Sequence, residues 1–224
     1  MFITLEGIEG SGKSTQILHV FNYLNKLGFL CKMTREPGGT RIGGKIRSIL
    51  LDPENSAMNP AAELLLYTAD RVQHIQEIIL PMIENGGIVI CDRYFDATLA
   101  YQGIARGLDM TLILDLHKLV CRNLKPDLTL LLDLPPDKGL QRAWKQLKSG
   151  SRTDSESRFE NETLAFHERV RAGYLAIAEK EPERFRIIDA SQSQDQVQDQ
   201  ITRVLEFEIK RFMDLSAQDD RKCT

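Results

Sequence analysis

The feature that most constrains the fold of this chain is a glycine-rich pattern near its beginning, GIEGSGKS at residues 7–14. It fits G-x-x-x-x-G-K-[ST] and lies between an apolar β-type run, residues 2–5, and a segment whose apolar residues recur at helical spacing. Glycines let such a loop curl so that backbone N–H groups point inward, and the following helix presents the positive end of its dipole.

This context predicts a loop that binds the phosphates of ATP or GTP. The Lys13 ammonium is expected to reach the β- and γ-phosphates, and the Ser14 hydroxyl is expected to face Mg²⁺. The alternative, a glycine-rich turn that Ser14 caps, does not explain why strand, motif and helix agree. The residues expected to contact the nucleotide here are Gly7, Ile8, Glu9, Gly10, Ser11, Gly12, Lys13, Ser14 and Thr15.

The rest of the chain continues the alternation of strand and helix patterns. Helical spacing recurs at residues 13–27, 42–50, 60–83 and 197–205. The predicted strands are residues 2–5, 29–33, 88–91, 128–132 and 186–188. Because these strands are continuously apolar instead of alternating, they favour a parallel sheet that helices cover on both faces. We therefore predict one α/β domain over residues 1–213, followed by a polar, frayed tail at 214–224.

Composition excludes several other classes of protein. Of the 224 residues, 42% are hydrophobic and 27% are charged, which is too apolar for a disordered chain. No apolar run reaches the roughly 18 residues that cross a bilayer. The net charge of −3 argues against a dedicated nucleic-acid binder. The N-terminus shows no signal-peptide pattern, so we expect a cytoplasmic enzyme without a nucleic-acid or membrane partner.

The cysteines and histidines show no pattern of a metal or disulfide site. The four cysteines lack C-x-x-C spacing, and Cys31 and Cys91 lie in apolar runs, where we expect buried, reduced thiols. No histidine belongs to an H-E-x-x-H pair. We expect solvated or hydrogen-bonded structural roles for His19, His74, His117 and His167.

The residues after the strand at 88–91 indicate which kind of nucleotide enzyme to expect. A switch GTPase needs an N-K-x-D motif, which the sequence lacks, and a motor ATPase usually ends this strand in Asp-Glu. Here the strand ends in Asp92-Arg93. A guanidinium beside the phosphate loop is suited to holding a second phosphorylated substrate, because its planar fork binds two phosphate oxygens at once. The sequence therefore favours a kinase of small molecules.

A series of further motifs carries a specific resemblance. The chain contains TREPGGT at 34–40, LLLYTADRVQH at 64–74, DRYFDATLAYQG at 92–103, RFENETLAFHERVRAGY at 158–174 and IIDAS at 187–191. With the phosphate loop, these motifs resemble bacterial thymidylate kinases (dTMP kinases), P-loop nucleoside monophosphate kinases, over nearly the whole chain. The resemblance implies a five-stranded parallel sheet with flanking helices and a mobile lid. It also implies Mg²⁺-dependent transfer of the ATP γ-phosphoryl group to dTMP, giving dTDP for dTTP biosynthesis, and a homodimer. The long apolar segment at residues 61–83 fits part of such an interface, although burial of a single helix would give the same pattern.

The resemblance assigns roles on the acceptor side of the site. Arg93 would hold the acceptor phosphate, with Arg35 and Arg47 as weaker candidates near it, although a solvated helix position would suit Arg47 equally. Glu9 would approach the acceptor, toward its 3′-hydroxyl or toward Mg²⁺, and the alternative is a carboxylate that points into solvent. Asp92 would support Mg²⁺ through water.

The resemblance also assigns residues to the base and sugar. Tyr67 would stack on thymine, and Arg71 would donate a hydrogen bond to its O4, whereas the alternative for Tyr67 is an ordinary core aromatic. Tyr101 would crowd a ribose 2′-hydroxyl and so favour deoxynucleotides. Thr98 and Gln102 belong to the same segment around the sugar and base.

A polar segment at residues 142–158 is the predicted lid. It holds five basic and two acidic residues, a net charge of +3 in a chain whose total is −3. Charge alone would fit a solvated face equally well. The phosphate loop contains no arginine, however, and the sequence resembles the thymidylate kinases in which the lid supplies the catalytic arginine. We therefore predict catalytic roles for Arg152 and Arg158, and place Arg142 on ATP or at the hinge of the lid.

Two alternatives stay open at the level of sequence. Another nucleoside monophosphate kinase, or a deoxynucleoside kinase, would share this architecture, and Tyr67, Arg71 and Tyr101 are the residues that distinguish it. The second alternative is a nucleotide-binding regulator without turnover, against which Lys13, Arg93 and the basic lid argue.

Overall fold

A parallel sheet forms the centre of the computed structural model, which describes residues 1–148 and 156–220, with the helical backbone alone for 215–220. Within this part of the chain, five strands lie in the order β2-β3-β1-β4-β5 and every pair is parallel. This confirms the predicted sheet. The strands are β1 (Phe2–Glu6), β2 (Cys31–Arg35), β3 (Ile88–Asp92), β4 (Leu128–Asp133) and β5 (Phe185–Asp189).

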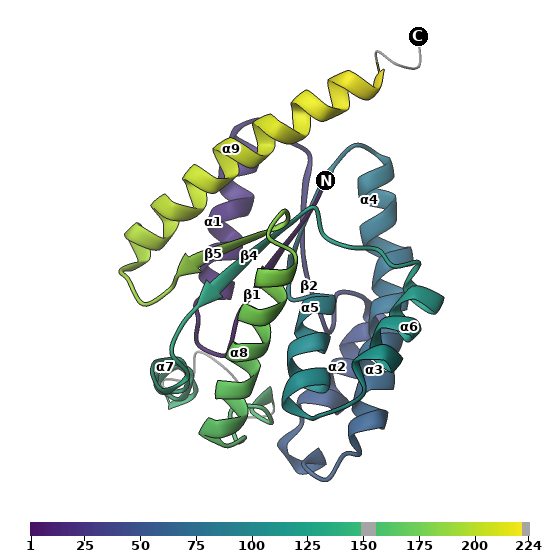
Figure 1. Ribbon diagram of the computed structural model, residues 1–224, viewed down its shortest axis with the longest axis vertical. Helices are drawn as coiled ribbons and strands as arrows, with labels where there is room; N and C mark the ends of the chain where they lie inside the picture. The colour runs from purple at the N-terminus through teal and green to yellow at the C-terminus, as the bar shows by residue number, and fades with distance from the viewer. Residues whose placement is uncertain (149–155, 221–224) are drawn as a thin grey trace.

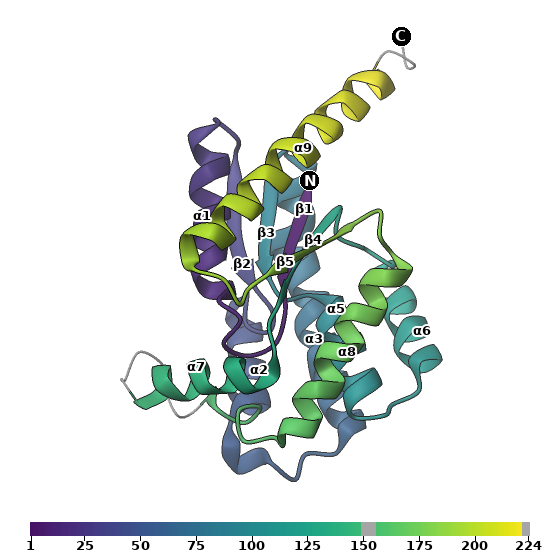
Figure 2. The same cartoon turned by 60° about the vertical axis from the view of Figure 1, so that its left-hand side comes forward.

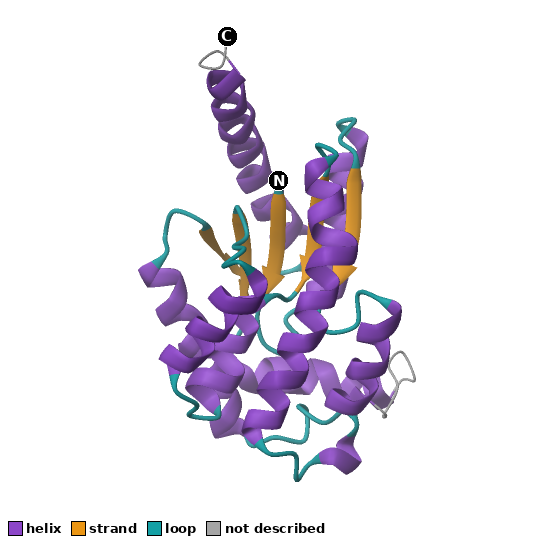
Figure 3. Ribbon diagram, turned by 90° about the vertical axis from the view of Figure 1, so that its right-hand side faces the viewer, coloured by secondary structure: helices purple, strands orange, loops and turns teal. Residues whose placement is uncertain are grey.

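Helices cover the sheet on both faces, as predicted (Figures 1 and 2). One face carries α1 (Lys13–Lys26) and α9 (Gln194–Asp220), while α4 (Leu80–Glu84), α5 (Phe95–Thr98) and α8 (Leu164–Lys180) lie on the other. Figure 3 shows the strands side by side, with a helix passing in front of them and further helices beyond their carboxyl ends. The remaining helical segments are α2 (Arg41–Leu51), η1 (Pro53–Asn55), α3 (Pro60–His74), η2 (Ile75–Ile79), η3 (Leu99–Ala105), α6 (Met110–Cys121) and α7 (Pro136–Lys148).

The register of the central strands brings the future site together. Leu5 pairs with Asp92, and Glu6 pairs with Leu131, so β1, β3 and β4 end at the same edge of the sheet. All five residues of β1 are buried, because β1 has a neighbour on each side and helices on both faces. The carboxyl edge of a parallel sheet is where ligands bind in such folds.

Strand β2 differs from its prediction in position and burial. It begins at Cys31, two residues later than expected, and the Cys31 thiol is half-buried instead of buried. The reason is that β2 is an edge strand, so one side of it faces solvent. Cys91 is fully buried in β3, as expected, and Cys31, Cys91 and Cys121 are free thiols.

The long helix predicted at 60–83 is interrupted by a wider turn. α3 passes through the π-helical turn η2 into α4, which contains Pro81. Proline lacks an N–H and clashes with the carbonyl group four residues earlier, and a π-helical turn relieves this conflict. The helices α5, η3, α6, α7 and α8 were not predicted from the sequence.

Two other boundaries differ from expectation. The first residues of the predicted lid, 142–148, are the end of α7, and residues 149–155 lie outside the described part of the chain. The polar tail predicted from residue 214 is helical up to Asp220, where α9 extends beyond the sheet in Figure 1. No helix in the described residues has the length and apolar character needed to cross a bilayer.

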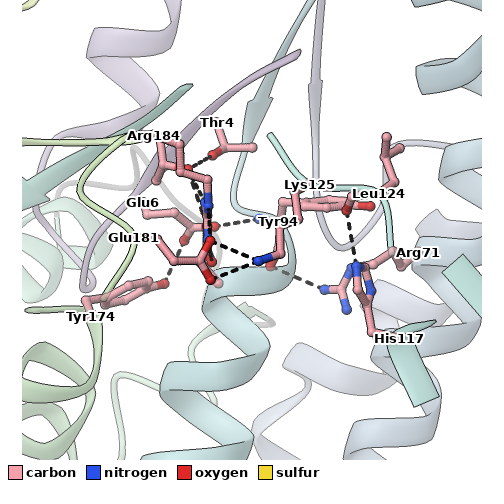
Figure 4. Close-up of polar contacts among 12 residues, drawn as sticks. Thr4, Glu6, Arg71, Tyr94, His117, Leu124, Lys125, Tyr174, Glu181 and Arg184 are labelled. Carbon is pink, nitrogen blue, oxygen red and sulfur yellow. Dashed lines mark hydrogen bonds and ion pairs between the residues drawn. The ribbon is translucent and has the colours of Figure 1, made fainter. Parts of the chain in front are cut away.

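A buried ion pair joins the start of β5 to the helical layer. Arg184 donates from Nη1 and Nη2 to the two carboxylate oxygens of Asp96, both at 2.7 Å, and from Nη1 to the Thr129 hydroxyl at 2.8 Å. Its Nε donates to Glu181, which also accepts from the exposed Lys125 (Figure 4). Each charge inside this cluster has an opposite partner, which burial requires.

Removing one side of this ion pair should destabilise the fold. Arg184→Met leaves Asp96 buried without a counter-charge, and we expect the free energy of unfolding to fall by about 3–5 kcal/mol. Lys125→Met removes an exposed charge from the same cluster and should cost less than about 1 kcal/mol. Urea denaturation followed by circular dichroism measures both. Similar small losses in the two variants would contradict the structural role given to Arg184.

Candidate active site

The loop between β1 and α1 depends on glycine backbone geometry. Gly10 and Gly12 have φ values of 70° and 97°, which residues with side chains rarely adopt. A Cβ on Gly10 would lie 2.0 Å from the main-chain oxygen of Gly139, so the loop and the first turn of α7 are in direct backbone contact. The predicted phosphate-loop residues thus form a tight turn at the N-terminus of α1, where backbone N–H groups attract anions.

The Lys13 side chain lies inside this loop. Its ammonium donates to the main-chain oxygens of Gly7 and Ile8 at 2.9 and 2.8 Å. Burial, aided by the charge of Arg93, lowers the pKa of Lys13 to about 8. A phosphate group in the loop would favour the charged ammonium again, because an opposite charge stabilises it. Lys13 is therefore placed to respond to a bound polyanion.

Arg93 follows β3 and connects the loop to α8. It has a φ of 69°, a left-handed conformation that is uncommon for arginine. Its Nη1 donates to the Tyr174 hydroxyl at 3.0 Å and its Nη2 donates to Glu9 at 2.9 Å, while its guanidinium lies over the Tyr101 ring. Strained backbone of this kind is concentrated at functional sites.

Glu9 is buried and paired, so it does not point into solvent. Its Oε1 accepts from Arg93 and from the Tyr101 hydroxyl, the latter at 2.6 Å, and its Oε2 lies 3.1 Å from Nδ1 of His167. Although burial opposes ionisation, Arg93 and His167 hold the pKa of Glu9 well below its usual range. A carboxylate inside the phosphate loop is thus balanced by cations on the acceptor side.

Arg71 reaches the site from α3 and is locked in place. Its Nε donates to Glu36 at 2.8 Å, and its Nη2 donates to the main-chain oxygen of Tyr94 and to the Thr98 hydroxyl. Glu36 also contacts Nδ1 of His74 at 2.9 Å. α3 therefore fixes both Arg71 and the loop at residues 34–40 that carries Arg35 and Glu36.

The residues predicted to surround base and sugar line one wall. Tyr67 is half-buried on α3, and Thr98, Tyr101 and Gln102 are buried on α5 and η3. Nε2 of Gln102 donates to Glu63 at 2.8 Å, which orients the amide with its carbonyl oxygen as the remaining acceptor. The structure therefore brings these four predicted residues together.

Arg47 reaches the same cavity from α2, and there it is paired. Nε and Nη2 form a two-pronged contact with the Glu156 carboxylate at 2.8 and 2.7 Å, and Nη1 donates to the main-chain oxygen of Pro37. Arg47 is largely shielded, so the alternative of a solvated helix residue does not describe it. Arg35 is exposed and also lines the cavity.

The predicted lid arginines have different positions. Arg158 is buried, donates to Glu63 at 2.5 Å and to the main-chain oxygen of Leu50, and is not a lining residue of the cavity. The structure thus shows Arg158 as a clamp on the buried Glu63, not as a cation that faces a transferring phosphate. Arg142 donates to the main-chain oxygen of Ala190 at 3.0 Å. Arg152 lies outside the described residues, and its catalytic role stays a prediction.

A single cavity of about 420 Å³ joins these groups. Lys13, Ser14 and Thr15 line its phosphate-loop end, with Asp92 and Arg93 beside them. The opposite wall contains Arg35, Arg47, Tyr67, Arg71, Thr98, Tyr101 and Gln102. This volume is within the range of a small-molecule site, and the cavity combines anion-binding groups with an aromatic surface. Such an arrangement can align two phosphorylated ligands.

Comparison with known proteins now gives the family. A sequence model described as thymidylate kinase matches residues 5–201. The chain belongs to the thymidylate kinase family. It is 56% identical over 190 residues to a thymidylate kinase of Desulfosudis oleivorans, an alignment that covers 85% of this chain and 89% of the relative. A thymidylate kinase of Desulforapulum autotrophicum is also 56% identical, over 197 residues, with 88% of this chain and 87% of the relative covered.

The fold of the family is shared as well. The crystal structure of a thymidylate kinase from Ehrlichia chaffeensis superposes with a TM-score of 0.71 at 34% identity, covering 92% of this chain and 98% of that chain. The predicted fold class and the family resemblance are therefore confirmed.

Several residues of this thymidylate kinase site were missed at the level of sequence. Glu6, Glu36, Glu63 and Tyr174 were not singled out, and His167 was expected to be only structural. Glu36, His167 and Tyr174 lie inside the very motifs that carry the resemblance. In the sequence, these residues could be noticed only as charged or polar side chains inside those motifs. The fold is needed to show which partner each of them contacts.

Glu6 is a fully buried carboxyl group at the end of β1, directly before the phosphate loop. Oε1 accepts from the main-chain N–H of Tyr94 at 2.7 Å, and Oε2 accepts from the Tyr174 hydroxyl at 2.7 Å (Figure 4). Burial, reinforced by the charge of Asp96, raises the pKa of Glu6 to about 8. The folded protein therefore keeps a proton on Glu6 at a pH where an unfolded chain would have lost it.

This proton should make stability depend on pH. A raised pKa in the folded state stabilises the fold fully below the ordinary glutamate range, and the contribution is lost as pH rises toward 8. Glu6→Gln keeps an acceptor for Tyr94 and a polar contact to Tyr174 but cannot titrate. Between pH 5 and 8.5, we expect the wild-type free energy of unfolding to fall by about 1–3 kcal/mol more than that of the variant. Urea denaturation across this range measures the difference, and parallel curves would contradict a neutral Glu6.

Proposed function

We propose that this chain transfers the γ-phosphoryl group of ATP to dTMP, giving dTDP. Membership of the thymidylate kinase family supports this proposal, as do the printed names of its relatives. The observation that carries it is the one cavity that joins Lys13 and the phosphate loop to Arg93 and to the wall of Tyr67 and Arg71. A protein that only binds ATP as a regulator would not need the end of the cavity that Arg93, Tyr67 and Arg71 line.

Catalysis in this site consists of alignment and charge neutralisation. Two polyanions must approach each other, and their negative charges repel. Hydrogen-bond donors that the protein holds in fixed positions neutralise these charges more effectively than water does. Lys13 and the backbone N–H groups hold the phosphates of ATP, and the N–H groups of Arg93 that Glu9 and Tyr174 do not use hold the acceptor phosphate. Arg35 and Arg47 lie beside that position. Arg152 is proposed to complete the set from the lid segment.

Selection of the base follows from two fixed side chains. The contacts of Arg71 occupy Nε and Nη2, which leaves Nη1 to donate to thymine O4. Gln102 presents its carbonyl oxygen, which accepts from the N3–H of thymine. Cytosine has an amino group and an unprotonated N3 at these places, so both contacts fail. Tyr67 offers its ring for stacking, and Tyr101 occupies the 2′ side.

Mg²⁺ fits the oxygen groups at the phosphate-loop end. The Ser14 hydroxyl and the Asp92 carboxylate both line the cavity there, and Mg²⁺ prefers oxygen ligands together with water and substrate phosphates. Ser14 would bind the ion directly and Asp92 would bind it through water. When bound, the ion neutralises charge on the β- and γ-phosphates.

The acceptor preference tests this proposal. Each well-made base or sugar contact that is lost costs about 1–3 kcal/mol, or about 5- to 150-fold in kcat/KM. We expect dTMP to be preferred over both dCMP and UMP by at least such a factor, measured with ATP in a coupled assay. Similar kcat/KM values for the three acceptors would contradict the assignment of Arg71, Gln102 and Tyr101. Phosphorylation of none would favour the regulator.

Tyr67 provides a matched pair of variants for the same assay. Tyr67→Phe keeps the ring and should change kcat/KM for dTMP by less than about three-fold, whereas Tyr67→Leu removes the stacking surface and should lower it about 5- to 150-fold. Equal effects of the two substitutions would show that stacking is not the role of this residue.

We also propose that the enzyme is a homodimer that uses α3 and α6. The two helices pack on each other, and they expose Leu65 (58% exposed) and Leu119 (80% exposed). Exposed apolar side chains of this size favour a protein interface. The segment at 61–83, predicted to contribute to a dimer, contains Leu65.

Charged substitutions should distinguish this interface from other apolar surface. Leu65→Asp or Leu119→Asp places a charge in the interface, so each should shift the protein from dimer to monomer. Phe207→Asp, at a 65% exposed position on α9, should leave the dimer intact. Sedimentation equilibrium of the three variants decides this, and a wild-type monomer would overturn the proposed dimer.

A further inference from the structure

His167 lies where three segments of the active site meet. It belongs to α8, and its side chain is fully buried. Nε2 lies 3.0 Å from the main-chain oxygen of Phe159, and Nδ1 lies 3.1 Å from Oε2 of Glu9 in the phosphate loop. One imidazole ring therefore connects α8 to the phosphate loop and to the segment that precedes α8.

Both neighbours of the ring are hydrogen-bond acceptors. A main-chain carbonyl cannot donate, so Nε2 carries a proton. Oε1 of Glu9 accepts from Arg93 and Tyr101, which stabilises the ionised carboxylate and makes Oε2 an acceptor as well. The carboxylate 3.1 Å from Nδ1 therefore favours a second proton on the ring. Although burial opposes this charge, the contact with Glu9 raises the pKa of His167 above its usual value.

The other charged groups around this pair do not replace His167. Arg93 and Lys13 act on Glu9 from β3 and α1, and Glu160 acts on His167. Arg93 and Tyr101 both bind Oε1, so His167 is the partner that the structure places beside Oε2. Oε1 thus has hydrogen-bond partners, whereas Oε2 meets the His167 ring of α8 at ion-pair distance without an aligned hydrogen bond. The ring therefore restrains the carboxylate from its second side.

The second contact of His167 reaches the wall of the cavity. Phe159 lines the cavity, and its ring packs edge-to-face on Tyr101 with centroids 5.4 Å apart. His167 itself is not a lining residue. Any effect of His167 on a bound acceptor must therefore act through Glu9 and Phe159.

We propose that His167 is a positioning residue for the acceptor nucleotide: it holds the Glu9 carboxylate toward the acceptor end of the cavity and ties it to Phe159. The inference rests on the proposed phosphorylation of dTMP. Without His167, Oε2 of Glu9 would lose its ion-pair contact, and the carboxylate would be freer to turn about its last side-chain torsion.

Steady-state kinetics of His167→Gln test this role. Glutamine carries no charge, and its two N–H donors share one nitrogen, so they do not match the two separated ring nitrogens that face Phe159 and Glu9. We expect kcat/KM for dTMP to fall about 10- to 100-fold, mainly through a higher KM for dTMP, while the KM for ATP stays within about three-fold. An unchanged KM for dTMP in folded His167→Gln would overturn the proposal.

A double-mutant cycle shows whether His167 acts through Glu9. If it does, Glu9→Gln/His167→Gln should lose little more activity than Glu9→Gln alone.

His117→Gln is the matched control, because His117 is also buried and contacts a main-chain oxygen, that of Leu124, at 3.1 Å. Burial lowers the pKa of His117 to about 4, so it is neutral and meets no carboxylate of the phosphate loop. Its effect should be additive with Glu9→Gln. Additivity of His167→Gln would overturn the proposal.

A spectroscopic measurement on the unmodified enzyme keeps the test independent of variant folding. Nitrogen-15 NMR of the histidine side chains at pH 7 should show His167 as an imidazolium, and a neutral ring would overturn the proposal. The dTMP kinase assay of the wild-type protein separates the proposed function from the proposed role of His167. Wild-type protein that does not phosphorylate dTMP refutes the proposed function, whereas an active wild type with an unaffected His167→Gln variant refutes the role of His167 alone.

Discussion

The pairing of buried carboxylates with arginines is the constraint on which this structure depends. A charge removed from water is costly, and it is tolerated only when a partner of opposite charge and good geometry is present. In the described part of the chain, four enclosed carboxylates each meet an arginine from a distant segment. The pairs are Glu9–Arg93, Glu36–Arg71, Glu63–Arg158 and Asp96–Arg184. Two of the four, Glu9–Arg93 and Glu36–Arg71, line the cavity, so ion pairs that complete the fold also shape the site.

This arrangement gives the site its precision. Arg71 is held by Glu36, Thr98 and the main chain of Tyr94, and Arg93 is fixed in the same way by Glu9 and Tyr174. Donors that are already oriented need no reorganisation when a charged ligand arrives. The cost is that these arginines are structural as well as functional, so substituting one disturbs the fold and the chemistry together.

The sequence predicts the scaffold far better than it predicts the pairs. The phosphate loop and the apolar strands are local patterns, and they are enough for the parallel sheet and for the ends of β1 and β3. Arg71, Tyr67 and Gln102 followed from resemblance, and the structure does place them around one cavity. Arg158 was misplaced because a lid composition says nothing of Glu63, which lies far away in sequence and is fully buried. Glu6 was missed for the same reason, and His167, which was expected to be hydrogen-bonded, meets partners that only the fold brings to it.

The backbone contact between Gly10 and Gly139 has a mechanical consequence. A Cβ on Gly139 would lie 2.5 Å from the main-chain oxygen of Glu9, and one on Gly10 would lie 2.0 Å from the main-chain oxygen of Gly139. At these two positions the phosphate loop and α7 therefore pack backbone against backbone, with no side chain between them. A methyl group at either position would force α7 and the phosphate loop apart. The shape of the loop expected to bind the triphosphate thus depends on Gly139 in α7, a residue that has no side chain.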